Sequence, residues 1–259
     1  MNKVALITGA SGGLGLQFAY IHASKGDNVI LVARNKEKML YLRRELIAKY
    51  GVTVYIIEKD LSHKRAAKDI YDDLHAKNIK IDYLINNAGF GDYGFFVKMD
   101  EKTMLDMLSV NIVTLTYLTR LFLPEMVNTR CGKILNVAST AAFQPGPTMA
   151  VYFATKSYVL SFTEALANEL KGKCVTATAL CPGPTDTDFK TTAKLMTNPL
   201  FQDKNIVDAK TVAEFGYRAM MKGKTVAIYG FSNRALAFLV RFAPRKVVTA
   251  FARKKMRET

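Results

Sequence analysis

Short apolar runs and amphipathic helical patterns alternate along most of this chain. Continuous aliphatic runs are typical of strands buried on both faces, and they predict strands at 3–7, 28–33, 53–57, 81–85, 133–138, 175–180 and 225–229. Apolar residues at three- and four-residue spacing predict helices between them, at 14–24, 35–50, 62–78 (capped by Ser62), 101–126, 150–170 and 208–222. This alternation predicts an α/β fold: a single doubly wound Rossmann-type domain, with a parallel seven-stranded sheet and helices on both faces.

The chain shows no Pro/Ser-rich linker, and its 259 residues suit one large domain. We predict a folded domain at 1–230 and a helical C-terminal extension of the same domain at 231–259, broken into two pieces by Pro244. Residues 188–206 show no regular pattern, and we expect them to be irregular.

A glycine-rich turn, TGASGGLG at 8–15, joins the first strand to the first helix. Gly9 permits a tight turn, Gly13 lets the backbone approach a pyrophosphate, and Gly15 lets the helix pack on the strand. Such a turn aims a helix N-terminus at a phosphate and predicts dinucleotide binding. The spacing G-x-x-x-G-x-G differs from the general G-x-G-x-x-G fingerprint, so the turn alone carries modest weight.

The coenzyme can be predicted from the end of the second strand. An acid there would hold the ribose 2′-hydroxyl of NAD, but the chain has Ala33 followed by Arg34. Arginine pairs with a 2′-phosphate, so NADP(H) is favoured over NAD(H). The alternative is that Arg34 only begins a solvated helix.

Small and polar residues follow several other predicted strands, at the edge where α/β sheets bind ligands. These are NNAG at 86–89, Ser139-Thr140 and CPGPTDT at 181–187. Asn111 lies within the apolar helix 101–126. A buried Asn needs hydrogen-bond partners, so its role could be purely structural.

Tyr152 and Lys156 are four residues apart on the predicted helix 150–170, and therefore share one face. A nearby ammonium favours the phenolate and would bring the Tyr152 pKa down toward neutrality, where a phenol can exchange protons with a substrate. The alternative is a structural pair: a buried Tyr beside a Lys that reaches solvent.

Together these motifs, in this order, resemble the short-chain dehydrogenase/reductase family over residues 3–230, and NVASTAAFQPGP at 136–147 resembles bacterial members described as uncharacterised oxidoreductases. The resemblance implies that Tyr152 is the general acid and base, that Lys156 lowers its pKa and holds the nicotinamide ribose, and that Ser139 binds the substrate carbonyl. It implies that Asn111 holds a water linked to Lys156. The other coenzyme contacts that it implies are Gly9, Ser11, Gly13, Leu14, Gly15, Asp60, Leu61, Asn87, Ala88, Gly89, Pro182, Gly183, Thr185 and Thr187.

Two positions depart from the family pattern. Thr185 stands where Val is frequent, so we expect contact through its backbone. Ser11-Gly12 lacks the basic residue that NADP-preferring members often carry in the glycine turn.

The implied function is NADPH-dependent reduction of an apolar aldehyde or ketone, reversible as alcohol dehydrogenation. Eight apolar residues are expected to line the substrate pocket: Phe90, Phe95, Phe143, Met149, Phe189, Leu195, Met196 and Phe201. The alternatives are a 3-oxoacyl-(acyl carrier protein) reductase and a non-catalytic dinucleotide-sensing protein. The intact Asn111, Ser139, Tyr152 and Lys156 set argues against the sensor.

The chain is basic, with a net charge of +15, and residues 231–259 hold eight Lys/Arg and one acid. A basic surface can attract anionic lipid or an acidic protein, or only aid solubility. The extension could rest on a membrane, cover the pocket mouth or lie at a subunit interface. The resemblance implies a homodimer, with a tetramer as the alternative. We expect no nucleic-acid partner.

Two further expectations come from absent signals. His22, His63 and His75 have no partner at metal-ligand spacing, and three cysteines cannot all pair, so we expect no metal and reduced, buried thiols. The sequence shows no signal peptide, and we expect a cytoplasmic protein.

Overall fold

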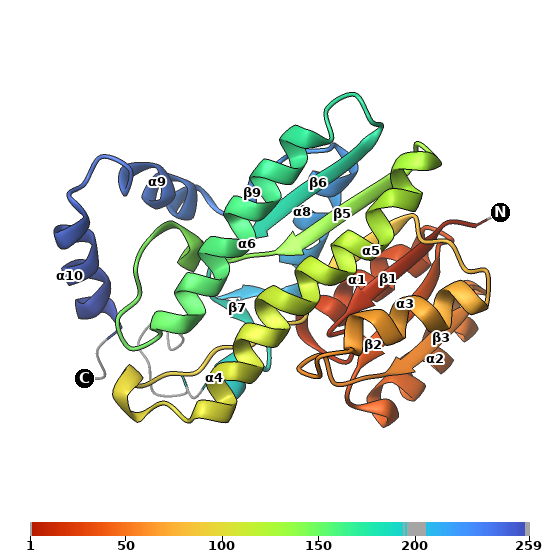
Figure 1. Ribbon diagram of the computed structural model, residues 1–259, viewed down its shortest axis with the longest axis horizontal. Coiled ribbons are helices and arrows are strands. Elements are labelled where there is room, and N and C mark those ends of the chain that lie inside the picture. The colour runs from red at the N-terminus through yellow and green to blue at the C-terminus, as the bar shows by residue number, and fades with distance from the viewer. Residues whose placement is uncertain (1, 194, 196–205, 257–259) are drawn as a thin grey trace.

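Seven parallel strands form one sheet between two helical layers (Figure 1), in a computed structural model that describes residues 2–193, 195 and 206–256. The spatial order is β3-β2-β1-β4-β5-β6-β9. The predicted doubly wound fold and its seven strands are confirmed. The strands are β1 (Val4–Thr8), β2 (Asn28–Ala33), β3 (Val54–Glu58), β4 (Tyr83–Asn86), β5 (Gly132–Val137), β6 (Val175–Cys181) and β9 (Val226–Ile228).

The helices divide between the two faces according to their apolar stripes. Phe18, Leu42 and Val212 belong to one buried cluster, and Ile70, Phe122 and Leu166 to the other. Fully burying each such side chain contributes roughly 1.5–3 kcal/mol. The first layer consists of α1 (Gly13–Ser24), α2 (Lys36–Tyr50) and α8 (Ala209–Met221), and the second of α3 (Ala66–Ala76), α5 (Leu115–Asn128) and α6 (Ala150–Glu169).

The strand order reverses between β1 and β4, because the chain builds outward through β2 and β3 before it crosses back. In open α/β sheets a reversal of this kind leaves a crevice at the carboxyl ends of the strands. The polar motifs that follow β1, β4, β5 and β6 therefore meet at one edge.

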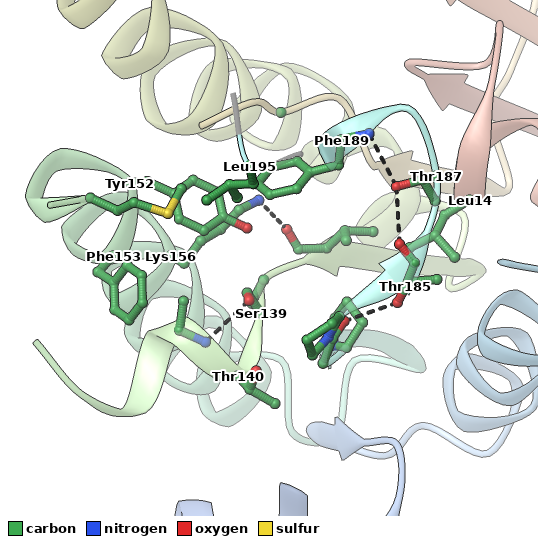
Figure 2. A pocket seen from close by; sticks show the side chains of 18 of the residues that line it. Leu14, Ser139, Thr140, Tyr152, Phe153, Lys156, Thr185, Thr187, Phe189 and Leu195 are labelled. Atoms are coloured by element: carbon green, nitrogen blue, oxygen red, sulfur yellow. Dashed lines mark hydrogen bonds between the residues drawn. The ribbon is translucent and has the colours of Figure 1, made fainter. Parts of the chain in front are cut away.

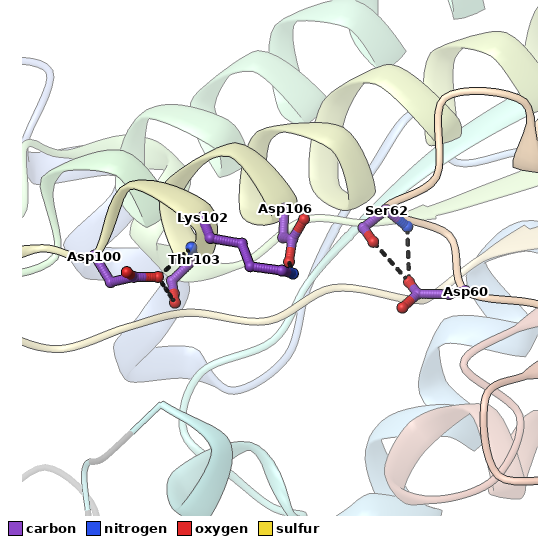
Figure 3. Close-up of polar contacts among 6 residues, drawn as sticks. All are labelled: Asp60, Ser62, Asp100, Lys102, Thr103 and Asp106. Atoms are coloured by element: carbon purple, nitrogen blue, oxygen red, sulfur yellow. Dashed lines mark hydrogen bonds and ion pairs between the residues drawn. The ribbon is translucent and has the colours of Figure 1, made fainter.

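The predicted helix 101–126 is confirmed in position but is not uniform. It consists of α4 (Glu101–Leu108), a π-helical turn η2 (Ser109–Thr114) and α5. Asp100 caps α4 by accepting from the Thr103 N–H at 2.8 Å (Figure 3). The π turn widens the helix at Asn111, which is fully buried.

Glu101–Asn128 is long and apolar enough to cross a membrane by length and composition. Here Leu118, Phe122 and Met126 are buried in the core cluster that it shares with the sheet and α3. One face of the helix is thus part of the core of this fold.

The predicted start of the third helix is wrong. Both the Ser62 N–H and hydroxyl donate to one Asp60 carboxylate oxygen, at 2.9 Å each (Figure 3). This local turn holds the chain out of helical geometry, and α3 begins only at Ala66.

Part of the stretch expected to be irregular is ordered. Helix α7 (Phe189–Thr192) lies within this stretch. Strand β7 (Thr185–Asp186) precedes it and pairs in parallel with β8 (Val207–Asp208), which follows it. Two 3₁₀ turns, η1 (Phe96–Lys98) and η3 (Thr140–Phe143), occur in segments expected to be loops.

The C-terminal extension forms two helices, α9 (Phe231–Leu239) and α10 (Arg245–Lys255), with Pro244 at the start of the second. The predicted break at Pro244 is confirmed. Both helices lie beyond the carboxyl ends of the central strands, at one end of the molecule (Figure 1). The Tyr93 hydroxyl donates to the Met256 carbonyl at 2.7 Å, which ties the end of the extension to the loop after β4.

Candidate active site

One cavity of about 420 Å³ lies at the carboxyl edge of the sheet, between the glycine turn and the C-terminal helices. Most residues predicted to form the site line it. These are Gly9, Ser11, Gly13, Leu14, Asn87, Ala88, Gly89, Ser139, Tyr152, Lys156, Pro182, Gly183, Thr185 and Thr187. Gly15, Arg34, Asp60, Leu61 and Asn111 were also predicted, and they do not line this cavity.

The glycine turn has the geometry of a phosphate cradle. Gly9 has φ +66°, which favours glycine, and a Cβ on Gly15 would lie 2.2 Å from the Gly9 carbonyl oxygen. Helix α1 begins at Gly13 with no side-chain cap and no acid in its first turn. Its first N–H groups can therefore bind an anion, and a dinucleotide pyrophosphate fits this donor set.

Asn87 fixes the turn against β4. Its side-chain Nδ2 donates to the Thr8 carbonyl at 2.8 Å, while the Thr8 hydroxyl accepts from the Asn87 and Ala88 N–H groups at 3.0 Å each. These bonds join the ends of β1 and β4 across the crevice. Asn87 thus has a structural role that its predicted coenzyme contact did not include.

The neighbouring strand ends carry the residues expected around the adenosine half. Arg34 is exposed at the end of β2, and Ala33 leaves no acid at the ribose position. Burial pushes the Asp60 pKa up, but the two Ser62 hydrogen bonds and the Arg34 charge outweigh it and hold that pKa below its usual value. Leu61 is buried in the core, and its carbonyl accepts from the Thr114 hydroxyl at 2.8 Å.

Tyr152 lies on the first turn of α6 with its ring buried against Phe189, 5.2 Å between ring centroids. Gly91 makes room for this ring, since a Cβ there would lie 3.1 Å from Tyr152 Cδ2 and 2.9 Å from Met149 Cε. Burial raises the pKa of Tyr152 to about 12, and the Ser139 hydroxyl offsets only part of this. In the free protein the pKa of Tyr152 is therefore raised, not lowered toward neutrality as predicted, because desolvation is the largest effect on the phenol.

Lys156 is buried below Tyr152, and its Nζ lies 5.8 Å from the Tyr152 ring centroid (Figure 2). The ammonium donates to the Val137 carbonyl at 2.8 Å. Burial lowers the pKa of Lys156 to about 8. An ammonium has three N–H donors, so the others remain to bind a ligand such as a ribose hydroxyl.

Ser139 lies two residues after the end of β5, beside Tyr152, and its hydroxyl accepts from the Ala141 N–H at 3.1 Å (Figure 2). The following N–H, of Thr140, donates to the Pro182 carbonyl at 2.9 Å. The β5 and β6 loops are therefore locked together, and the Ser139 proton remains to bind a carbonyl oxygen.

Asn111 stands behind the cavity wall. Its Nδ2 donates to the Phe90 carbonyl at 2.9 Å and to the Thr155 hydroxyl at 3.0 Å, and its Oδ1 accepts from the Phe90 N–H at 3.1 Å. A Cβ on Gly89 would lie 3.0 Å from Asn111 Oδ1 and 3.2 Å from Lys156 Nζ. Asn111 thus holds the loop that follows β4, which is the structural role that the sequence allowed.

The substrate end of the cavity is apolar, as expected, but its walls differ from the prediction. Met149, Phe189 and Leu195 line it, whereas Phe90, Phe95 and Phe143 do not. Phe95 points outward and is exposed, while Phe90 and Phe143 pack against core clusters. Met196 and Phe201 lie outside the described residues.

The C-terminal extension contributes cavity walls that were not named from the sequence. Leu236, Phe251, Lys255 and Met256 line the cavity, and Met256 shares a buried cluster with Tyr152. A Cβ on Gly183 would lie 2.7 Å from Asn233 Nδ2, so the β6 loop packs directly against α9. The spacing of Val248, Ala252 and Met256 was the available signal that one face of α10 is buried.

Titratable clusters elsewhere are sparse. The described part of the chain holds no group of three His, Cys, Asp or Glu side chains able to bind a metal ion. The three cysteines are free, but only Cys181 is buried; Cys174 is exposed and Cys131 half-buried, which corrects the expectation of three buried thiols.

Known proteins match both the sequence and this architecture. Residues 3–198 match the family model described as short chain dehydrogenase. A very-long-chain 3-oxoacyl-CoA reductase from Anas platyrhynchos is 34% identical over 184 residues, which cover 69% of this chain and 58% of that protein. The chain thus spans less than two thirds of that relative's length.

Bacterial proteins are also similar. A 3-oxoacyl-[acyl-carrier-protein] reductase FabG from Aquifex aeolicus is 31% identical over 187 residues, covering 72% of this chain and 75% of the relative. An uncharacterised oxidoreductase from Staphylococcus saprophyticus is 29% identical over 212 residues, covering 82% and 91%. A short-chain dehydrogenase from Sphingobium yanoikuyae, solved in complex with NADPH, superposes with a TM-score of 0.84 at 27% identity and covers 93% of each chain.

The fold and the cavity define a dinucleotide-binding α/β protein with a buried Tyr–Lys pair. The chain belongs to the short-chain dehydrogenase family, whose members are oxidoreductases that bind a nicotinamide dinucleotide.

Proposed function

We propose that this protein is an NADPH-dependent reductase of apolar aldehydes or ketones, with Tyr152 as the general acid. The observation that carries the proposal is the placement of Tyr152, Ser139 and Lys156 on one cavity that also contains the glycine cradle. The reverse reaction, alcohol dehydrogenation, would use the same groups.

The mechanism follows from the three side chains. A bound nicotinamide coenzyme would supply the hydride that is added to the carbonyl carbon. As negative charge builds on the carbonyl oxygen, the Ser139 and Tyr152 hydroxyls donate hydrogen bonds to it. Tyr152 then delivers its proton to that oxygen, and the Lys156 ammonium stabilises the phenolate that remains.

Neutral Tyr152 is well suited to reduction, because a pKa of about 12 keeps the proton on the phenol at neutral pH. Oxidation of an alcohol instead requires the phenolate. The protonation state of the free protein therefore favours the reductive direction.

NADP(H) is the proposed coenzyme over NAD(H). Ala33 leaves no acid to repel a 2′-phosphate, and exposed Arg34 can pair with it. The similar Sphingobium protein was solved with NADPH, which agrees with this choice.

The proposed substrate is apolar at the end remote from its carbonyl group. Met149, Leu195 and Phe251 border the cavity there, together with Phe189 beside the Tyr152 ring. Fatty or aromatic carbonyl compounds suit these walls, since apolar pockets with a few placed polar groups bind such ligands.

A second candidate is reduction of a 3-oxoacyl thioester, on acyl carrier protein or on coenzyme A. Several similar proteins carry names of this kind, and the net charge of +15 would suit an acidic carrier or a phosphorylated coenzyme. A non-catalytic dinucleotide sensor is less well supported, because it has no need of the hydroxyls of Ser139 and Tyr152.

The proposal includes a cytoplasmic homodimer. Exposed Leu105, Val113 and Tyr117 lie on the α4–α5 helix, and exposed Tyr158 lies on α6, so these helices offer apolar surface to a second copy. Three free thiols suit a reducing compartment. We also propose that the basic extension makes peripheral contact with a membrane.

The test is a panel of carbonyl compounds with NADPH, followed by absorbance of the coenzyme. The panel contains aliphatic and aromatic aldehydes and ketones, 3-oxoacyl-coenzyme A and 3-oxoacyl-acyl carrier protein. Turnover of free apolar carbonyls supports the proposal, and exclusive turnover of thioesters supports the second candidate. NADPH binding without any turnover would favour the sensor.

A further inference from the structure

The outer surface of α9 carries large apolar side chains in contact with solvent. Phe231 and Phe238 are seven residues apart on α9 and so lie on one face of it, and Phe242 lies in the turn that follows the helix. They are 79%, 58% and 72% exposed, and the Phe238 and Phe242 rings pack edge to face at 5.1 Å. None of the three lines the cavity.

Helix α10 has two distinct faces. Val248, Ala252 and Met256, at four-residue spacing, are buried against the body of the protein. Val247 and Phe251, one residue earlier on each turn, are 60% and 48% exposed. The solvent side of α10 therefore also exposes apolar side chains.

Positive charge surrounds these apolar side chains. Seven Lys/Arg side chains and no acid occur in residues 231–256, and all seven are exposed. Within the part of the chain that the structure describes, none of them forms an ion pair. Lys255 instead lies over the Phe251 ring at 5.4 Å. They are Arg234, Arg241, Arg245, Lys246, Arg253, Lys254 and Lys255.

The geometry points to the α9–α10 surface as a docking site for an anionic lipid bilayer. Exposed phenylalanines insert into the boundary between headgroups and acyl chains, while Lys and Arg bind the lipid phosphates, and both groups alternate on these helices. A second copy would bring an equally basic surface to the same place and be repelled. An acidic protein would match the charge, but it would leave the exposed phenylalanines unexplained.

The docking surface also adjoins the entrance of the cavity. Phe251 and Lys255 are exposed on α10 and also line the cavity. Leu236 of α9 and the buried Met256 line it as well. A bilayer bound to these helices would therefore meet the cavity mouth, and an apolar substrate could pass from the lipid without crossing water. This second part rests on the proposed function.

The docking site is tested by cosedimentation of the full chain with vesicles of phosphatidylcholine, with or without phosphatidylglycerol. We expect strong binding to the anionic vesicles that falls with added salt, and weak binding to the neutral ones. The double variant Arg241→Ala/Lys246→Ala should bind anionic vesicles about 25-fold more weakly, at roughly fivefold for each basic residue. Phe238→Ser/Phe242→Ser should lose binding to a similar degree.

Lys171→Ala/Lys173→Ala is the matched control, since both lysines are exposed after α6, near the amino end of β6. Its vesicle binding should equal that of the parent. All substituted side chains are exposed, and thermal unfolding midpoints near the parent value would show that each variant is folded. Failure of the parent to bind anionic vesicles, or equal loss in the control, overturns the docking site.

Substrate entry is tested with one apolar ketone dissolved in vesicles and one short, water-soluble aldehyde, each with NADPH. Phe238→Ser/Phe242→Ser should reduce the soluble aldehyde at the parent rate and the vesicle-borne ketone at least several-fold more slowly. Equal rates on both substrates would overturn entry from the bilayer. If the parent reduces neither compound, the proposed function fails, while cosedimentation still decides the docking site.

Discussion

Tyr152 and Lys156 owe their proton affinities to burial, and burial acts on them in opposite directions. It raises the pKa of the phenol to about 12 and lowers that of the ammonium to about 8. Between these values Tyr152 keeps its proton while Lys156 loses its charge. The lysine, rather than the tyrosine, should therefore set the alkaline limit of reduction.

This difference predicts the pH profile of kcat/KM for NADPH, which reports groups of the free protein. The profile should be flat near pH 6–7 and should fall with an apparent pKa of about 8, as Lys156 loses its proton. A profile that stays flat to pH 10 contradicts the assignment.

The proposed coenzyme preference depends on Arg34, at the same scale. Arg34→Ala should weaken NADPH binding by roughly ten- to a hundredfold, the worth of a hydrogen bond to a charged group, and leave NADH nearly unchanged. Affinities are measured by coenzyme fluorescence titration. Arg44→Ala, an exposed arginine within α2, is the matched control and should change neither. An unchanged NADPH/NADH ratio in Arg34→Ala would rule out the phosphate contact.

At the scale of elements, the C-terminal extension completes the cavity that the sheet only begins. Helix α10 is held by its buried face and by the Tyr93–Met256 hydrogen bond. The β6 loop and α9 pack without space for a Cβ at Gly183. The substrate pocket is therefore assembled from parts more than a hundred residues apart in the sequence.

Tyr93→Phe tests this assembly. Loss of one hydrogen bond costs about 1 kcal/mol, so the end of α10 should loosen and KM for an apolar carbonyl substrate should rise roughly fivefold with kcat little changed. Steady-state kinetics at saturating NADPH provide the measurement. Tyr41→Phe, an exposed tyrosine on α2, serves as the control and should match the parent. If Tyr93→Phe also matches it, α10 does not shape the substrate site through this bond.

The elements also show what the sequence could and could not predict. Apolar runs predicted all seven strands of the main sheet, because strands buried on both faces leave a continuous aliphatic signal. The π turn at Asn111 was not predicted, because the Asn111 side chain bonds to a residue distant along the chain. The late start of α3 was not predicted either, because it depends on the local turn in which Ser62 donates to Asp60. The cavity-lining residues of the C-terminal extension were missed, because amphipathic spacing indicates that one face of a helix is buried but not which part of the protein that face packs against.

For the whole molecule, the apolar surface of the α4–α5 helix and α6 predicts self-association. Val113 is 53% exposed on the π turn, and the Tyr158 hydroxyl meets that of Thr116 at 3.1 Å between the two helices. A charge buried without a partner in such an interface is strongly destabilising.

Val113→Glu should therefore convert a dimer to a monomer in sedimentation velocity at micromolar concentration. Val97→Glu is the matched control, because Val97 is exposed on η1, outside these helices, and it should leave the dimer intact. A parent that sediments as a monomer would contradict the dimer. A dimer that persists in Val113→Glu would contradict an interface at these helices.

The central claim is that Tyr152 delivers the proton to a carbonyl substrate. The most direct measurement is NADPH oxidation by Tyr152→Phe with a carbonyl compound that the parent reduces, beside NADPH binding by the same variant. General acid catalysis contributes about 10²–10⁴-fold, so turnover should fall by at least a hundredfold while NADPH binding stays within a few-fold. Tyr158→Phe, an exposed tyrosine on the same helix, should keep parental turnover. Parental turnover by Tyr152→Phe would contradict the account.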